Sequence, residues 1–209
     1  MNILTRIWHR GLTILCHCLY RNVSPKAIID HRVIVYNKNN LYMDEDSNID
    51  AGGVIMNTRA NFIMKKWSGA AIGLLVVTGN HMSVCGMNFK QVTNKVKDEL
   101  DKKHNMDKDV IVEEDVWLGS HTTLLSGVTV GRGCEVGSGS VIRCNIPPYA
   151  IVTGNPAKVV GFRFTPEEII EHEKVLYPEE DRLPLVLLEK NYEKFFLKRL
   201  KEIKEFTRL

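Results

Sequence analysis

Seven histidines are the side chains of this sequence best suited to proton transfer near neutral pH, because the unperturbed imidazole pKa is about 6.5. One of them, His81, closes the apolar run LLVVTGNH, immediately before a polar segment. A base in such a place can take a proton from a hydroxyl and so make its oxygen a better nucleophile. Taken alone, the position is more typical of a polar residue at the end of a strand, so its chemistry depends on the elements around it.

Those elements show a six-residue period through the second half of the chain. An aliphatic residue recurs at every sixth position, as Val112, Leu118, Leu124, Val130, Val136 and Ile142. Four positions after each comes a small or β-branched residue, namely Val116, Thr122, Val128, Cys134, Ser140 and Ile146. Six is even, so the repeat keeps one side of a strand facing inward, whereas a helix needs a period near 3.6. The pattern predicts short strands in a coil that stacks on itself.

The same columns carry a resemblance to a known family. With the segments DVWLGSHTTLLSGVTVGRGCEVGSGSVI and IPPYAIVTGNPAKVV, the sequence resembles the hexapeptide-repeat acyltransferases of the galactoside and maltose O-acetyltransferase type. The resemblance implies a left-handed parallel β-helix with three hexapeptides per coil, an exception to the usual right-handed crossover. Residues 112–129 and 130–147 would then be two coils. Their stacked pairs would be Val112 over Val130, Leu118 over Val136 and Leu124 over Ile142.

Upstream of residue 110 the period is looser. Ile63, Gly69 and Leu75 keep the six-residue step and predict about one further coil. Residues 82–109 break the step and are rich in Lys, Asp and Asn, which indicates a loop, and the residues before 62 contain β-type segments without a clear register. We therefore expect an all-β core in three parts: an N-terminal helical segment (1–30), a β-helix domain (31–163) and a C-terminal helical extension (164–209).

Two apolar stretches are candidates for a membrane span, and neither has the composition of one. In the N-terminal segment, Arg6, His9 and Arg10 leave only residues 11–20 free of charged side chains, which is too short to cross a bilayer and favours an amphipathic helix. Residues 67–89 lack Asp, Glu, Lys and Arg, but glycines, asparagines and a histidine interrupt them. That composition favours buried β structure followed by a loop.

The C-terminal extension has two helix signals. Thr165, Pro166 and Glu168 match a capped helix start. A second helix is expected near Pro184, with an apolar stripe that would pack on the coils or on another subunit: Leu188, Tyr192, Phe195, Phe196, Leu200, Ile203 and Phe206.

The resemblance assigns roles to particular residues. His81, in its TGNH context, matches the family's catalytic base, and Asn61 and Asn80 are the expected acceptor-binding residues. Acetyl-CoA would be the co-substrate and no metal would be needed. The expected acetyl-CoA contacts are Trp117, Gly119, Ser120, Ser138, Arg143, Cys144, Lys158 and Arg163, with the Ser120 amide as a donor to the oxyanion.

Some of these positions depart from the family pattern. Ser138 replaces a usual Ala, which keeps a backbone contact available. Arg143 and Cys144 stand where Thr and Lys are frequent, so the phosphate contact that Lys usually makes would fall to Arg143. A basic residue is frequent where this chain has Gly161, and Arg163 is the nearest replacement.

Composition excludes several other classes. A net charge of +3 without a basic stripe argues against a nucleic-acid partner. The cysteines are odd in number and lack CxxC spacing, which argues against a disulfide framework or structural zinc and fits a cytoplasmic protein; they are Cys16, Cys18, Cys85, Cys134 and Cys144.

The resemblance therefore implies a homotrimeric, acetyl-CoA-dependent O-acetyltransferase with sites between subunits, acting on a sugar or polysaccharide-precursor hydroxyl. N-acetylation of an amino sugar and transfer to a serine-type hydroxyl remain open as alternatives. A β-helix zinc carbonic anhydrase needs three converging histidines, and the coils contain only His121. A non-catalytic scaffold is the remaining alternative.

Overall fold

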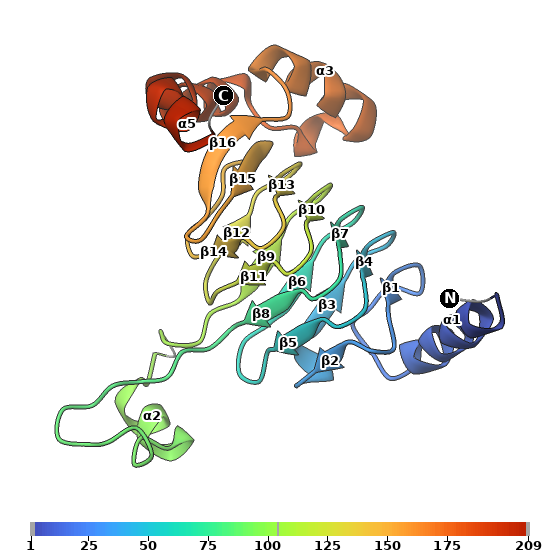
Figure 1. Cartoon of the computed structure of the whole chain (residues 1–209), viewed down its shortest axis with the longest axis vertical. Coiled ribbons are helices and arrows are strands. Elements are labelled where there is room, and N and C mark those ends of the chain that lie inside the picture. Colours follow the sequence, from blue (N-terminus) through green and yellow to red (C-terminus); the bar gives the residue numbers. More distant parts are fainter. Residues whose placement is uncertain (1–2, 104, 208–209) are drawn as a thin grey trace.

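The computed structural model describes residues 3–103 and 105–207. Parallel strands coil into a stack with three faces, helices lie at both ends of the stack, and one long segment leaves its side (Figure 1). Each turn of the coil adds one strand to each face, as the six-residue period requires.

Face 1 contains β1 (Ile28–Ile29), β4 (Asn48–Ile49), β7 (Gly69–Ala70), β10 (Trp117–Leu118), β13 (Glu135–Val136) and β15 (Ala150–Thr153), followed by antiparallel β16 (Lys158–Phe162). Face 2 contains β2 (Ile34–Val35), β5 (Val54–Met56), β8 (Leu75–Val77), β11 (Thr123–Leu124) and β14 (Val141–Ile142). Face 3 contains β3 (Leu41–Met43), β6 (Phe62–Met64), β9 (Val110–Val112) and β12 (Thr129–Val130). The first strand thus begins at Ile28.

The predicted aliphatic column is the core of the stack. Val112 pairs with Val130, Leu118 with Val136 and Leu124 with Ile142, as expected. All six residues are buried. The second column is buried as well and fills the corners between faces. Burial raises the pKa of the Cys134 thiol to about 12, which keeps that corner residue uncharged.

The upstream residues that keep the predicted six-residue step lie on the outer side of their strands. Ile63, Gly69 and Leu75 pair with Ile111, Trp117 and Thr123, which occupy the outer side of the strands. The fully buried residues are instead their successors, Met64, Ala70 and Val76. Both sets keep a six-residue step, so the period alone does not decide which points inward. In the sequence this inward column is hard to recognise, because its middle member, Ala70, has a small side chain.

Upstream of Val112 the coils are complete, and their irregular spacing comes from a single corner. Between faces 2 and 3 the step in residue number is eight from Val35 to Met43, nine from Ile55 to Met64 and thirty-six from Val76 to Val112, in place of six. The steps from face 3 to face 1 and from face 1 to face 2 stay at six. The insertions therefore lie side by side at the corner that we call corner 2–3.

Helices close the two ends of the stack. Helix α1 (Ile3–His17) lies beside β1, and the C-terminal helices cover β15 and β16 at the opposite end (Figure 1). The remaining helices are α2 (Asn94–Leu100), α3 (Pro166–Leu176), α4 (Leu185–Phe195) and α5 (Leu200–Thr207), with 3-10 turns at Lys38–Asn40, Glu179–Asp181 and Leu197–Arg199. Within the described ranges, no helix combines the length and apolar character needed to cross a membrane.

The C-terminal signals are confirmed with one difference. Thr165 and Glu168 form the expected capping box, and α4 starts directly after Pro184. The apolar stripe, however, belongs to two helices, because Phe196 leaves the helical conformation at φ −122°. This break lets the Phe196 ring reach Phe162 at the end of β16, with 6.4 Å between ring centroids.

Candidate active site

His81 lies where the chain leaves the stack after β8. Its side chain is exposed, and Nδ1 donates a hydrogen bond to the Met82 carbonyl at 2.9 Å. The carbonyl can only accept, so this bond places the ring proton on Nδ1 and leaves the Nε2 lone pair available. The ring also meets Phe89 edge to face, with 5.9 Å between centroids. This is the arrangement that a general base requires.

The imidazole borders a pocket of about 240 Å³ at corner 2–3. The floor comes from the ends of β5 and β8, including Met56 and Val77, and the opposite wall comes from the inserted segment, including Met82 and Val92. Polar groups of both walls reach the same space. The long insertion thus converts a coil corner into a cavity with the His81 imidazole at its edge.

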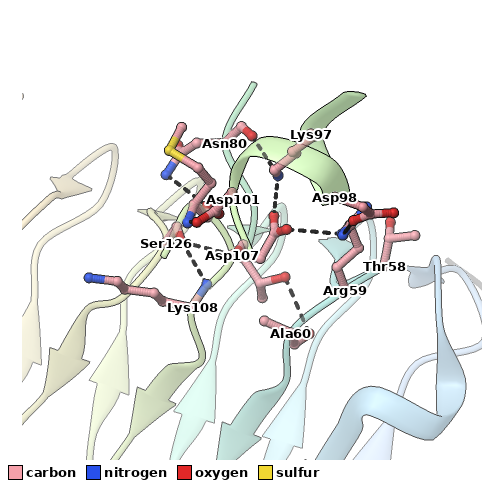
Figure 2. A network of polar contacts seen from close by, with 12 residues as sticks. Thr58, Arg59, Ala60, Asn80, Lys97, Asp98, Asp101, Asp107, Lys108 and Ser126 are labelled. Carbon is pink, nitrogen blue, oxygen red and sulfur yellow. Dashed lines mark hydrogen bonds and ion pairs between the residues drawn. The ribbon is translucent and has the colours of Figure 1, made fainter. Parts of the chain in front are cut away.

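A buried ion-pair network holds the insertion against the stack (Figure 2). Lys97 of α2 donates to Asp107 at 2.6 Å, and Arg59 of the preceding coil pairs with the other oxygen of Asp107 at 2.9 Å. Arg59 also donates to Asp98, and this hydrogen bond raises the pKa of Arg59. The side chains of Lys97 and Asp107 are only 9% and 3% exposed, so each charge depends on its partners.

The network reaches the residue next to His81. Besides Asp107, the Lys97 ammonium donates to the Asn80 carbonyl at 2.8 Å. The Asn80 amide in turn donates to the Met106 carbonyl at 3.0 Å. The backbone N–H and C=O of Asn80 are therefore both hydrogen-bonded to the inserted segment, which fixes the direction in which the chain carries His81.

The two ends of the insertion, at Thr78 and Lys108, are hydrogen-bonded to the coils on either side. Ser126 Oγ donates to the Thr78 carbonyl at 2.8 Å and accepts from the Lys108 amide at 3.1 Å. Thr78 Oγ1 donates to the Ala60 carbonyl at 3.2 Å. Three successive levels of corner 2–3 are joined in this way (Figure 2).

The two expected acceptor residues have different surroundings. Asn80 borders the His81 pocket, whereas Asn61 lies outside its lining. The Asn61 amide and side chain both donate to the Asp109 carboxylate, at 2.7 and 3.3 Å. Within one chain, Asn61 therefore supports the end of the insertion.

Three expected cofactor residues stack at corner 1–2, between faces 1 and 2. Gly119 donates to the Val136 carbonyl at 2.8 Å, and Ser120 accepts from Gly139 at 2.8 Å. A side chain at Gly119 would lie only 2.6 Å from the Ser138 nitrogen, so glycine is required for the corners to stack. Gly119, Ser120 and Ser138 are thus neighbours in adjacent coils.

The remaining candidates are dispersed. Trp117 is half-exposed on face 1, where its ring covers Gly69. Arg143 and Cys144 are exposed at corner 2–3, two coils beyond the His81 level.

Lys158 and Arg163, the last two expected cofactor residues, already have ionic partners. Lys158 pairs with Glu202 of α5 at 3.4 Å. Arg163 pairs with Asp115 at 2.8 Å and with Glu135 at 3.4 Å. A phosphate contact by either residue would compete with these pairs.

Sequence reasoning missed Lys97, Asp107 and Arg59. In the sequence they resemble solvated charges, since Lys97 and Asp107 fall in a segment rich in Lys and Asp. The two residues are ten positions apart, and Arg59 belongs to another coil, so no local spacing connects them.

Among residues 3–103 and 105–207, no three His, Cys, Asp or Glu side chains come together as a metal ligand set. Cys18, Cys85, Cys134 and Cys144 are free thiols. The side chain of Cys16 lies outside the described residues.

Comparisons with known proteins agree with this architecture. Residues 109–144 match the sequence model for the bacterial transferase hexapeptide (six repeats). A search of curated protein sequences found no match.

Solved structures share the fold at low sequence identity. A hexapeptide-repeat-containing acetyltransferase from Vibrio cholerae is 18% identical over 76% of this chain and 80% of its own, with a TM-score of 0.54. A maltose O-acetyltransferase from Clostridium difficile is 18% identical over 75% and 85%, with a TM-score of 0.55. A mutant of an N-acyltransferase from Bacillus cereus, in complex with dTDP and coenzyme A, is 16% identical over 78% and 94%, with a TM-score of 0.58. The expected left-handed parallel β-helix of hexapeptide repeats is thereby confirmed.

Proposed function

We propose that this chain, which has the hexapeptide repeats and the fold of the hexapeptide-repeat acyltransferases, transfers an acetyl group from acetyl-CoA to a hydroxyl of a sugar or polysaccharide precursor. The observation that carries the proposal is His81 at the edge of the corner 2–3 pocket, with Nδ1 bonded to the Met82 carbonyl. A maltose O-acetyltransferase and a complex with coenzyme A among the similar structures support the sugar acceptor and the co-substrate.

In this mechanism His81 Nε2 takes the proton of the acceptor hydroxyl as its oxygen attacks the thioester carbonyl. The tetrahedral oxyanion is stabilised by a backbone amide, for which Ser120 is the candidate. Collapse of the intermediate breaks the carbon–sulfur bond, and the imidazolium returns the proton to the departing thiolate. The products are the acetyl ester and free CoA, and neither a metal nor a covalent enzyme intermediate takes part.

The same proposal includes a homotrimer. His81, Arg143 and Cys144 lie at corner 2–3, whereas Gly119, Ser120 and Ser138 lie at corner 1–2, so face 2 separates the two groups in one chain. A single substrate can meet both groups where the corners of neighbouring subunits adjoin, and there Asn61 of the neighbouring subunit is the expected acceptor contact. This separation supports sites between subunits.

An acceptor screen tests the activity. Purified protein is given acetyl-CoA with sugars, nucleotide sugars, amino sugars and serine, and free thiol release is followed. Transfer to sugar hydroxyls supports the proposal. Transfer confined to amines would replace O-acetylation with N-acetylation, for which the similarity to the Bacillus cereus N-acyltransferase is the motive.

Mixed assemblies test the shared site. His81→Ala and Asn61→Ala proteins are each expected to be inactive, and refolding them together should restore part of the activity. Restoration follows only if an intact His81 of one subunit meets an intact Asn61 of another. A fully active monomer in sedimentation experiments would contradict this arrangement.

A further inference from the structure

Helix α1 packs on the protein through its polar face and leaves its apolar face exposed, the reverse of an ordinary surface helix. A helix on a globular protein normally turns its apolar face to the core and its polar face to water. Here His9 stacks on His31 of the first coil, with 4.9 Å between ring centroids, and the Thr13 hydroxyl lies 3.4 Å from the same ring. The polar face of α1 is thus the one that contacts the protein.

The apolar face of α1 points away from the stack. Ile7, Trp8, Ile14 and Leu15 are 63%, 66%, 66% and 69% exposed. They form two i, i+7 pairs, so they lie on one side of the helix. Ile28, which is 58% exposed, borders the same groove as Ile14 and continues the apolar surface onto the first coil.

The charge around this face is predominantly positive, because Asp30, which borders the same groove as Ile14 and Ile28, is neutralised by Arg32 at 2.8 Å. Residues 1–29 contain Arg6, Arg10, Arg21 and Lys26 and no Asp or Glu. Arg10 and Arg21 are exposed in the structure. A helix with Trp and aliphatic residues on one side and arginines beside them has the composition that binds at the boundary between lipid headgroups and acyl chains. Anionic headgroups attract such basic residues, whereas a second copy of the same basic segment would repel it.

We propose that α1 docks this protein on the surface of an anionic lipid bilayer. The helix lies in the plane of the interface with Ile7, Trp8, Ile14 and Leu15 among the upper acyl chains, and the neighbouring arginines bind lipid phosphates. The C-terminal helices and the coils point away from the bilayer, because α1 occupies one end of the stack (Figure 1). The docking is independent of the proposed acetyl transfer.

Vesicle co-sedimentation of the full chain tests the proposal. The probes are vesicles of phosphatidylcholine alone and of phosphatidylcholine with phosphatidylglycerol. We expect binding to the mixed vesicles and at least a tenfold weaker partition to the neutral ones, with a fall in binding at high salt as the Debye length decreases from about 10 Å at 0.1 M to about 3 Å at 1 M. Equal binding to both kinds of vesicle, or none to either, would overturn the proposal.

Two double variants distinguish binding through α1 from binding through any exposed apolar side chain. Trp8→Glu with Ile14→Glu places two carboxylates on the docking face and should reduce partition about tenfold or more. Val175→Glu with Val186→Glu makes the same charge change at 83% and 74% exposed residues of α3 and α4 and should leave partition unchanged. Equal loss in both pairs would contradict a role of α1.

The folded state and the mass of each variant are measured in parallel. Circular dichroism should give the wild-type melting temperature for both double variants, because all four side chains are exposed. Sedimentation without vesicles should give the wild-type mass. A lower mass for the Trp8→Glu, Ile14→Glu protein would mean that a second copy of the chain covers this face, and the lipid proposal would then be wrong.

Discussion

The coils before and after Val112 share one core and differ at one corner. From Val112 to Ile142 every corner keeps the six-residue step, whereas the earlier coils insert residues only at corner 2–3. The inward columns stack in register through both regions. Strand pairing therefore restrains the faces strictly, while a corner accepts added chain, because loop closure becomes more costly only slowly with length.

The difference separates the regular coils, which support the fold, from the insertion, which carries the proposed active site. The longest insertion carries His81 and the charged network that holds it, and the regular coils present repeated backbone groups at corner 1–2. Variants in the two regions should accordingly fail in different ways. Damage to the regular coils should lower stability, and damage to the insertion should lower activity at constant stability.

The largest effect is expected from Val136→Asp in the regular coils. Val136 is buried between Leu118 and Val152 in the inward column, with 2% of its surface exposed. A carboxylate buried there without a partner costs several kcal/mol. The free energy of unfolding of a typical domain is only about 5–15 kcal/mol, so this cost removes a large part of it. Thermal melts should show an unfolded or strongly destabilised protein. Ser138→Ala, at an exposed corner, should melt like the wild type, and the reverse order would disprove the register.

His81→Ala should affect activity alone. Loss of a general base typically slows turnover by about 10² to 10⁴, and the exposed ring contributes nothing to the core. Steady-state kinetics are compared with the melting temperature and with CoA binding, both of which should stay at the wild-type values. His121→Asn is the matched control in the regular coils, since Asn tolerates the left-handed φ of 57° at that position. Wild-type turnover by His81→Ala would remove this residue from the mechanism.

Lys97→Met should have an intermediate effect. The variant removes the hydrogen bond to the Asn80 carbonyl and one partner of Asp107, so the segment that carries His81 becomes less well positioned. Turnover should fall by about 10- to 100-fold, and amides of α2 should exchange faster with solvent.

Lys95→Met, at an exposed lysine of the same helix, provides the control for Lys97→Met and should change neither turnover nor exchange. Unchanged exchange in Lys97→Met would show that the network does not hold the insertion in place.

The smallest effect is expected from two glycines with left-handed backbone and open space around them. Gly139, in a regular corner, has φ +72°, and Gly86, in the insertion, has φ +84°. Alanine at either position costs about 1–2 kcal/mol of local strain. Gly139→Ala should lower the melting temperature, whereas Gly86→Ala should leave it unchanged if the insertion opens before the coils unfold. Equal shifts would mean that the two regions unfold as one unit.

The regular coils after Val112 could be predicted from the sequence more accurately than the coils before it, which contain the insertions. The column from Val112 to Ile142 predicted the stacked pairs correctly, because a period of six repeated without interruption leaves one way to bury it. Upstream, insertions at corner 2–3 interrupted the period, so the sequence predicted about one further coil and no clear register before residue 62, where the structure has strands from Ile28 onward. Ile63 and Met64 belong to two columns with the same six-residue step, and only their burial in the structure shows that the Met64 column faces the core.

The sequence by itself determined the coil, the loop after β8, the capped start of α3 and the position of His81 at a strand end, since each depends on local period or local residue chemistry. Only the tertiary structure decided that Arg59, Lys97 and Asp107 meet, because an ion pair between separate coils has no local spacing. It also decided that α1 turns its apolar side outward. An amphipathic pattern defines two faces of a helix, but contacts with the rest of the chain determine which one is left to the solvent.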